Sequence, residues 1–282
     1  SIATTITEAL PTGYVMTGVS CTGMGAGGTV TPNLSAGTFA FDAAATSAGS
    51  NIVCTVTNSK TPTVKVQKIT TGAVGGPFSF AQTNLASTPS NITTTATSTA
   101  TPASPTAINV TTIGSAVTLT ETPASGFLLS TASCTDANSL VTGNVGSTFA
   151  TLSGNTLTIP STNLKAGADF TCTFTNVRRP TITITKVSSG GVGAFTFTGS
   201  NGFASQTITT VSSGVGVAGA TQTLTNASTS TTITETVPYG YALTNMACTG
   251  LGTGTATVNY ATATVTLDTN ATAATNNVAC TF

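Results

Sequence analysis

Six cysteines, three glutamates and a few lysines and asparagines are the residues of this chain whose types and spacing could support covalent or ionic chemistry. The cysteines form three consecutive pairs, separated by 33, 38 and 32 residues: Cys21 with Cys54, Cys134 with Cys172, and Cys248 with Cys280. The similar spacing predicts one disulfide in each of three segments, and the chain-entropy model gives about 3.5–4 kcal/mol for a loop of that size. Free buried thiols are the alternative. Zinc binding is not expected, because the chain has no histidine and no C-x-x-C motif.

A lysine, a glutamate and an asparagine are each expected to point into the interior of one segment. Lys68, Glu121 and Asn176 each end a run in which apolar residues occupy every second position. Because side chains of a strand alternate between its two faces, each of these polar groups shares a face with apolar neighbours. A lone buried charge is very costly, so the three groups should meet. Partial sets are Lys186 with Glu235, and Glu8 with Asn58.

These residues lie in an internal repeat. The motif around Glu8 recurs around Glu121 and Glu235, so that the repeat length is 113 and then 114 residues. A C-T-V/F-T-N block also recurs, as does a strand-like run after a proline. We expect residues 1–59 to be the C-terminal half of a β-sandwich repeat, 60–178 a complete repeat, and 179–282 a nearly complete one. The incomplete ends predict either a piece of a longer array or completion by strands from neighbouring subunits.

The fold expected from these repeats is all-β. Apolar and polar residues alternate with a period of two, Gly, Pro, Asn and Ser separate the runs, and no apolar stripe is long enough for a helix. The pattern predicts tandem antiparallel β-sandwich repeats, Ig-like or prealbumin-like, of about 115 residues each. The pairs Gly75-Gly76 and Gly190-Gly191 are expected to form hairpin turns. Short joints that end in proline, at Pro62 and Pro180, predict a stiff rod.

Composition limits the function. The 282 residues include seven basic and seven acidic side chains, so the net charge is zero, which leaves no electrostatic footprint for nucleic acid. No apolar run approaches the roughly 20 residues that span a membrane. We expect no enzyme activity, no cofactor and no bound metal. Asp42 and Asp268 are expected at turns, and the N-x-S/T sequons are expected from a Thr-rich composition alone.

The repeat resembles the CnaB-type, prealbumin-like domains of bacterial surface adhesins and pilus-like fibres. The resemblance rests on a Lys in the first strand, a T-x-T-E-x-x-P-x-G-Y motif and an Asn in the last strand. The motif is strongest at two sites: Glu8, Pro11, Gly13 and Tyr14, and Glu235, Pro238, Gly240 and Tyr241. The middle repeat departs from it, with Pro123 one place early and Phe127 in place of Tyr, and disulfides are not a usual mark of that family.

The resemblance implies an intramolecular isopeptide bond. Lys68 would be the nucleophile, Asn176 the electrophile and Glu121 the proton shuttle. Lys186 and Glu235 would need an Asn just beyond Phe282, and Glu8 and Asn58 would need a Lys before Ser1. A buried ion pair with an Asn hydrogen bond is the main alternative, and exposed, separate groups are the other.

The expected function is structural. The pattern favours an extracellular repeat protein that forms a filament, fibre or sheath on a bacterial surface, stabilised by disulfides and isopeptide bonds. The alternative is the stalk or ligand-binding region of a cell-surface adhesin. Expected partners are copies of the chain itself, because the near absence of charge leaves little repulsion between them. Host or surface glycans are a further partner class.

Overall fold

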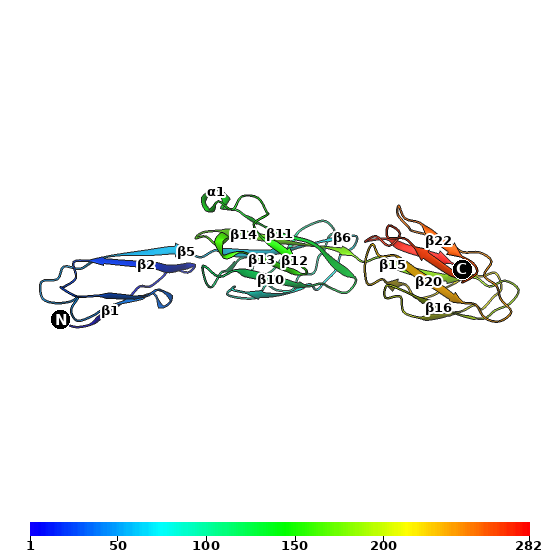
Figure 1. The fold of residues 1–282 in the computed structure, drawn as a ribbon, viewed down its shortest axis with the longest axis horizontal. Coiled ribbons are helices and arrows are strands. Elements are labelled where there is room, and N and C mark those ends of the chain that lie inside the picture. Colours follow the sequence, from blue (N-terminus) through cyan, green and yellow to red (C-terminus); the bar gives the residue numbers. More distant parts are fainter.

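The computed structural model describes all residues, 1–282, as three β-sandwich bodies in a line (Figure 1). Each body consists of two sheets, as expected for an all-β chain whose strands bury one face. The alternation of apolar residues is the cause: in the strand Thr63–Thr71, every second side chain from Val64 onward is buried. No helix is long and apolar enough to cross a membrane.

The middle domain has two sheets around one core. One sheet has the order β11-β14-β6-β8, with β9 also paired to β6, and the other has the order β12-β13-β10-β7. A four-residue helix, α1, lies in the loop between β11 and β12. The elements are β6 (Thr63–Thr71), β7 (Ser79–Thr83), β8 (Thr101–Pro102), β9 (Ile108–Asn109), β10 (Val117–Thr122), β11 (Phe127–Asp136), α1 (Ser139–Thr142), β12 (Thr151–Ser153), β13 (Thr156–Ile159), η2 (Ser161–Asn163) and β14 (Asp169–Arg178).

The third domain repeats this topology, with sheets β18-β15-β24-β21 and β17-β16-β20-β23-β22, and with β19 paired to β15. Its strands are β15 (Thr181–Lys186), β16 (Ala194–Gly199), β17 (Gln206–Thr209), β18 (Val217–Ala218), β19 (Gln222–Thr223), β20 (Thr231–Thr236), β21 (Ala247–Thr249), β22 (Ala256–Asn259), β23 (Thr264–Leu267) and β24 (Asn277–Thr281).

The first domain contains the strands that correspond to the second half of the repeat. A three-stranded sheet, β1-β4-β3, faces a two-stranded sheet, β2-β5. Its elements are β1 (Thr4–Thr7), β2 (Tyr14–Thr22), β3 (Val30–Asn33), the 3-10 helix η1 (Leu34–Ala36), β4 (Thr38–Phe41) and β5 (Val53–Lys60). Its small buried core consists of Met16, Phe39, Phe41 and Ala45.

Two details of the topology differ from the sequence expectation. The first and last strands of a repeat are parallel neighbours, β6 with β14 and β15 with β24, although the strands around them are antiparallel. The prediction of hairpin turns at Gly75-Gly76 and Gly190-Gly191 is wrong. The strands before and after each turn belong to different sheets, so the turn carries the chain across the sandwich, where Phe78 and Phe195 enter the core.

The domains are joined by strands that continue almost without a break. β5 ends at Lys60 and β6 begins at Thr63, while β14 ends at Arg178 and β15 begins at Thr181. Backbone hydrogen bonds hold both joints in the same way: Thr61 N to Gly13 O at 2.7 Å and Gly167 N to Lys60 O at 2.9 Å, then Arg179 N to Gly126 O and Thr275 N to Arg178 O, both at 2.8 Å. Each joint is therefore tied to the domain on either side of it.

Candidate functional site

The candidate site lies in the middle domain, where three strands bring Lys68, Glu121 and Asn176 together. β6 and β14 are adjacent in one sheet, with Lys68 in register with Phe174. Glu121 comes from β10, in the opposite sheet, and faces them across the core. The burial patterns of β6, β10 and β14 alternate strictly up to these residues, which is why all three polar side chains point inward.

The three side chains form one closed cluster. Lys68 Nζ donates to Asn176 Oδ1 at 2.6 Å and to the Phe174 carbonyl at 2.9 Å, and lies 3.2 Å from Glu121 Oε2. Asn176 Nδ2 donates to Glu121 Oε1. Lys68 and Asn176 are fully buried and Glu121 is 1% exposed, so water does not compete for these contacts.

Burial moves both titratable groups towards their neutral forms. Removal from water lowers the pKa of Lys68 to about 8, although the nearby Glu121 opposes the shift. Burial also raises the pKa of Glu121, against the opposing effects of Lys68 and of the Asn176 hydrogen bond. Burial thus favours the neutral amine and the protonated carboxyl over the charged pair.

An aromatic ring completes the cluster. Lys68 Nζ lies 4.6 Å from the centroid of the buried Phe78 ring. Phe78 opens a Phe-Ser-Phe run and was not expected at the site from the sequence. Repetition was the available signal, because the same motif recurs around Phe195.

The third domain contains the same pair of charged groups in the same setting. Lys186 Nζ lies 2.6 Å from Glu235 Oε1 and 4.4 Å from the centroid of the Phe195 ring. Both side chains are nearly fully buried. In the first domain, Asn58 Nδ2 donates to Glu8 Oε1 at 2.6 Å, and both groups are partly open to solvent. The three partial or complete sets therefore occupy equivalent positions.

A disulfide joins the paired cysteines in each domain. The S–S distances are 2.11 Å for Cys21–Cys54, 1.97 Å for Cys134–Cys172 and 2.02 Å for Cys248–Cys280. In each case the two cysteines are direct antiparallel partners, on β2 and β5, β11 and β14, or β21 and β24. The bond therefore ties the last strand of a repeat to one neighbour, and Lys68 approaches Asn176 from the other neighbour.

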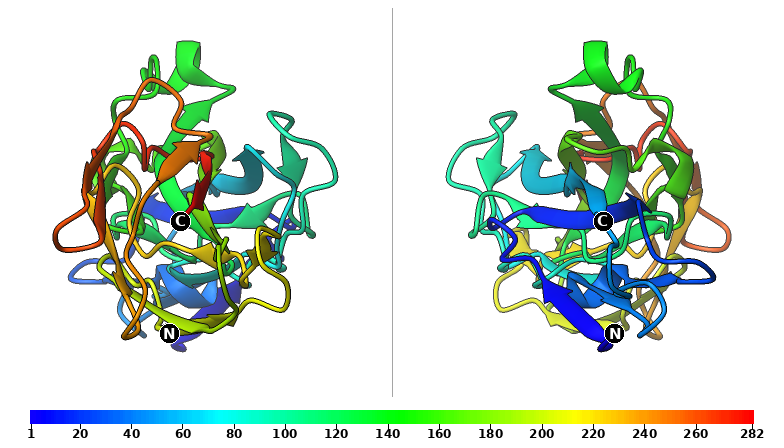
Figure 2. Two further views of the ribbon diagram at one scale, coloured as in Figure 1. Left: turned by 90° about the vertical axis from the view of Figure 1, so that its right-hand side faces the viewer. Right: turned by 90° about the vertical axis from the view of Figure 1, so that its left-hand side faces the viewer.

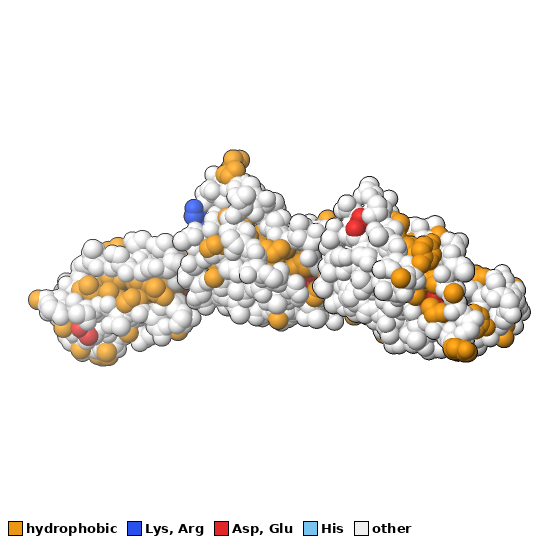
Figure 3. Space-filling view, turned by 45° about the vertical axis from the view of Figure 1, so that its right-hand side comes forward, with side chains coloured by type: hydrophobic (Ala, Val, Ile, Leu, Met, Phe, Trp, Pro, Cys, Tyr) orange, Lys and Arg blue, Asp and Glu red, His pale blue; other side chains and the backbone are white.

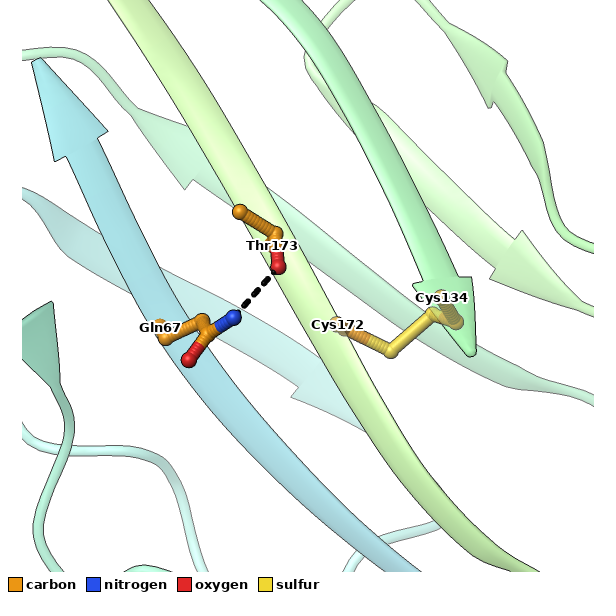
Figure 4. Close-up of a disulfide and its surroundings, with 4 residues drawn as sticks. All are labelled: Gln67, Cys134, Cys172 and Thr173. Carbon is orange, nitrogen blue, oxygen red and sulfur yellow. Dashed lines mark hydrogen bonds between the residues drawn. A yellow bond between two sulfur atoms is a disulfide. The ribbon is translucent and has the colours of Figure 1, made fainter. Parts of the chain in front are cut away.

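The opposite face of β14 is polar but carries no part of this cluster. Gln67 Nε2 on β6 donates to Thr173 Oγ1 on β14 at 2.7 Å, beside the Cys134–Cys172 disulfide (Figure 4). Gln67 and Thr173 are half-buried, and Cys134 and Cys172 are fully buried. Neighbouring residues of β14 therefore face opposite sides of the sheet, with Cys172 in the core and Thr173 on the outer face.

A buried polar network around Asp136, in the middle domain, was not expected from the sequence. The Asp136 carboxylate accepts hydrogen bonds from the side chains of Thr142 and Asn144 and from two backbone amides. The only sequence signal was the loop after Cys134, which is longer than its counterparts after Cys21 and Cys248. Asp42 and Asp268 lie at turns, where each accepts hydrogen bonds from a threonine and an alanine amide.

The family model that matches the chain describes a prealbumin-like fold domain. It matches three times, over residues 1–60, 64–178 and 182–282. No curated protein sequence matches the chain.

Several solved structures are similar to the chain at low identity. A pilus adhesin, SpaC from Lactobacillus rhamnosus GG, is 16% identical over 99% of this chain and 43% of its own length, with a TM-score of 0.30. The chain thus spans less than half of that adhesin. An adhesin from Mobiluncus mulieris with disulfide, isopeptide and ester cross-links is 10% identical over 59% of this chain and 90% of its own, with a TM-score of 0.26. The major pilin T3.2 from Streptococcus pyogenes is 12% identical over 78% and 97%, also with a TM-score of 0.26.

Proposed function

Because the chain belongs to the prealbumin-like fold domain family, with three consecutive matches, we propose that it is a load-bearing segment of an extracellular fibre on a bacterial surface. Its unit is the repeat 60–178, strengthened by a Lys68–Asn176 isopeptide bond and by the disulfide between Cys134 and Cys172. The observation that carries the proposal is the buried cluster in which Lys68 of the first strand and Asn176 of the last strand meet Glu121 from the opposite sheet.

The proposed reaction needs only groups present in this cluster. The neutral Lys68 amine attacks the Asn176 carboxamide carbon, and Glu121, which lies beside both the amine and Nδ2, transfers a proton from the attacking nitrogen to the leaving nitrogen. The Nζ–Cγ bond forms, the Cγ–Nδ2 bond breaks, and ammonia leaves with protons relayed through Glu121. The amine lies in contact with the carboxamide, and Nδ2, the leaving nitrogen, already donates to Glu121, which favours this route.

The disulfides favour an extracellular location, and the low charge favours association between copies of the chain. Disulfides persist in oxidising compartments, and each domain has one. The seven acidic and seven basic side chains leave a net charge of zero, so that little repulsion opposes the association of copies. Copies of the same chain are therefore the partners that we propose.

Mass spectrometry of the intact protein tests the proposal. The wild-type chain should be lighter than its sequence mass by one ammonia for the middle repeat, after the hydrogens lost from disulfides are counted. Glu121→Gln should restore the full mass while the disulfides remain. Glu235→Gln is the matched control, and it should leave the loss from the middle repeat unchanged. An unmodified wild-type mass would reduce the cluster to a buried ion pair with an Asn hydrogen bond.

A further inference from the structure

An Ile-Thr-Thr tripeptide lies at equivalent places in the middle and third domains, at residues 92–94 and 208–210. In both domains the isoleucine pairs through its backbone with the phenylalanine that lies over the buried lysine, Phe78 or Phe195. The two domains follow one another along the rod (Figure 2), and each has its own core. The same local arrangement is therefore present twice, in two separate cores.

The last threonine of the tripeptide in the middle domain, Thr94, holds the turn that carries the chain from one sheet to the other. Thr94 N donates to Gly75 O at 2.9 Å, and Thr94 Oγ1 accepts from Gly75 N at 3.0 Å. Thr94 Oγ1 also lies 2.8 Å from Thr70 Oγ1, and both threonines are buried. Thr70 lies on β6, two residues after Lys68 and on the same face. The two hydroxyls therefore tie the turn to the strand that carries the amine.

The third domain has the same contacts with one residue changed. Thr210 N donates to Gly193 O at 2.9 Å, and Thr210 Oγ1 accepts from Gly193 N at 3.0 Å. The partner hydroxyl belongs to a serine: Ser188 Oγ lies 2.7 Å from Thr210 Oγ1, and Ser188 follows Lys186 by two residues. What the two domains share at this position is thus the hydroxyl and its hydrogen bond, not the methyl group of a threonine.

The turn held in this way brings an aromatic ring against the amine. Phe78 follows Gly75 by three residues, is fully buried, and has its ring centroid 4.6 Å from Lys68 Nζ. The Phe127 ring packs edge-on against Phe78, with centroids 5.4 Å apart. Gly75 lies so close to Phe127 that a Cβ atom on Gly75 would be 2.3 Å from that ring. The turn and the two rings are one packed unit, so a shift of the turn moves the ring that covers the amine.

The cover matters because the chain keeps its reactive groups inside. Few charged side chains appear on the face shown in Figure 3, whereas Lys68 and Glu121 are buried. Burial is the largest cause of the lowered pKa of Lys68, so water admitted beside Phe78 would raise that pKa towards 10.5. Because the neutral amine is the nucleophile, a higher pKa leaves less of the reactive form near neutral pH.

We propose that Thr94 is a positioning residue for the cross-linking reaction. By fixing the turn, it holds Phe78 over the Lys68 amine and keeps water away from the cluster. Thr94 makes its hydrogen bonds to Thr70 and Gly75 and to none of the reacting groups, so it acts only through the turn and the ring. The inference rests on the proposed function for the reaction that it serves, but the pKa of Lys68 is measurable whether or not the bond forms.

Titration of Lys68 in the Glu121→Gln chain, followed by the Cε resonance of its side chain, tests the cover while Lys68 is a free amine. Adding Thr94→Val removes the hydroxyl and should raise the pKa of Lys68 by about one unit or more. Thr94→Ser keeps the hydroxyl and should leave that pKa unchanged. Thr120→Val is the matched control, because it removes a hydroxyl pair of the same kind, with Thr156 at 2.9 Å, and it too should leave the pKa unchanged.

The rate of ammonia loss is the second measurement, made on the chain with Glu121 intact. Chain refolded from denaturant, with an unmodified starting mass, is followed by mass spectrometry at pH 7. Thr94→Val should lose ammonia at least about tenfold more slowly than wild type, since a rise of one unit in the pKa lowers the neutral fraction of Lys68 about tenfold. Thr94→Ser and Thr120→Val should match wild type.

A Lys68 pKa that does not respond to Thr94→Val would overturn the inference. An equal shift in Thr120→Val would overturn it too, because any lost hydroxyl pair would then loosen the sandwich. A wild-type chain of full mass would reject the isopeptide bond alone, and the pKa of Lys68 would still decide the role of Thr94. If Thr94→Val does not fold, Thr70→Val removes the other hydroxyl and keeps the bonds to Gly75. It should raise the pKa by less, and no rise would reject the inference.

Discussion

Lys68, Glu121 and Asn176 show how a strand pattern can place three polar groups where none would be stable alone. Each ends an alternating apolar run, and each lies inside the sandwich. As an ion pair, this cluster contributes little to the free energy of unfolding, because the cost of removing two charges from water offsets much of their attraction. The same burial makes the amine a better nucleophile, since it favours the neutral form.

The pH dependence of the free energy of unfolding should reveal whether Lys68 remains a free amine or has become an amide. The Glu121→Gln variant keeps Lys68 as a free amine. It also removes the negative charge that raises the pKa of Lys68, so the pKa of Lys68 should fall below about 8. Between that value and 10.5, the unfolded chain binds a proton that the folded domain does not. The free energy of unfolding of this variant should therefore rise with pH, by up to about 1.4 kcal/mol per pH unit.

A cross-linked wild-type domain should lack this rise, because an amide does not titrate. The free energy of unfolding of both proteins is measured by denaturant titration at several pH values between 7 and 10. Hydrogen exchange of the β6 and β14 amides serves as the readout for the middle domain. A flat profile for Glu121→Gln would contradict the assignment of Lys68 as a buried amine.

At the scale of the element, β14 is an interior strand of its sheet. It pairs with β11 on one side and with β6 on the other. Its inward face carries Cys172, Phe174 and Asn176, and its outward face carries threonines. One strand therefore joins the disulfide, the aromatic core and the candidate cross-link.

Removal of the disulfide should weaken the middle domain without abolishing its fold. The double variant Cys134→Ser with Cys172→Ser loses a bridge that closes a separation of 38 residues, so the free energy of unfolding should fall by about 3–4 kcal/mol. Hydrogen exchange of β14 amides reports this domain alone. Cys248→Ser with Cys280→Ser is the control and should leave those amides unchanged, whereas an equal effect would mean that the domains unfold together.

At the scale of the molecule, the rod concentrates tension on two adjacent strands. The N-terminal joint leads directly into β6 and the C-terminal joint follows β14, and these strands are parallel neighbours. A pull along the rod therefore shears their hydrogen bonds and any covalent bond between them. Lys68 and Asn176 lie on this pair of strands, whereas the disulfide lies between β14 and β11.

Single-molecule stretching should distinguish the mechanical effect of the Lys68–Asn176 bond from that of the disulfide. Wild type should not extend through the middle domain, because force would pass directly through the Lys68–Asn176 bond. Glu121→Gln should unfold under force with the loop between Cys134 and Cys172 held closed. Reduction should then release 38 more residues, or about 130 Å of chain. A wild-type domain that extends as far as Glu121→Gln would argue against the bond.

Much of the fold was predictable because it depends on local periodicity. Alternation with a period of two indicates half-buried strands wherever they pair, so the all-β sandwich is confirmed by the family match and by the sheets. The Gly75-Gly76 turn was mispredicted for the opposite reason. Glycines permit a tight turn, but whether the next strand stays in the same sheet depends on where its apolar face finds a core.

The sequence by itself determined which residues repeat, which faces are apolar, and that Lys68, Glu121 and Asn176 point inward, because parity along a strand is a local property. Only the tertiary structure decided that β6 and β14 are parallel neighbours, that Glu121 reaches them from the opposite sheet, and that Phe78 covers the amine. It alone brought Thr94 to the crossover turn, since Thr94 finds its hydrogen-bond partners up to 24 positions away. Contacts of that range depend on how strands are ordered in space, which no local pattern specifies.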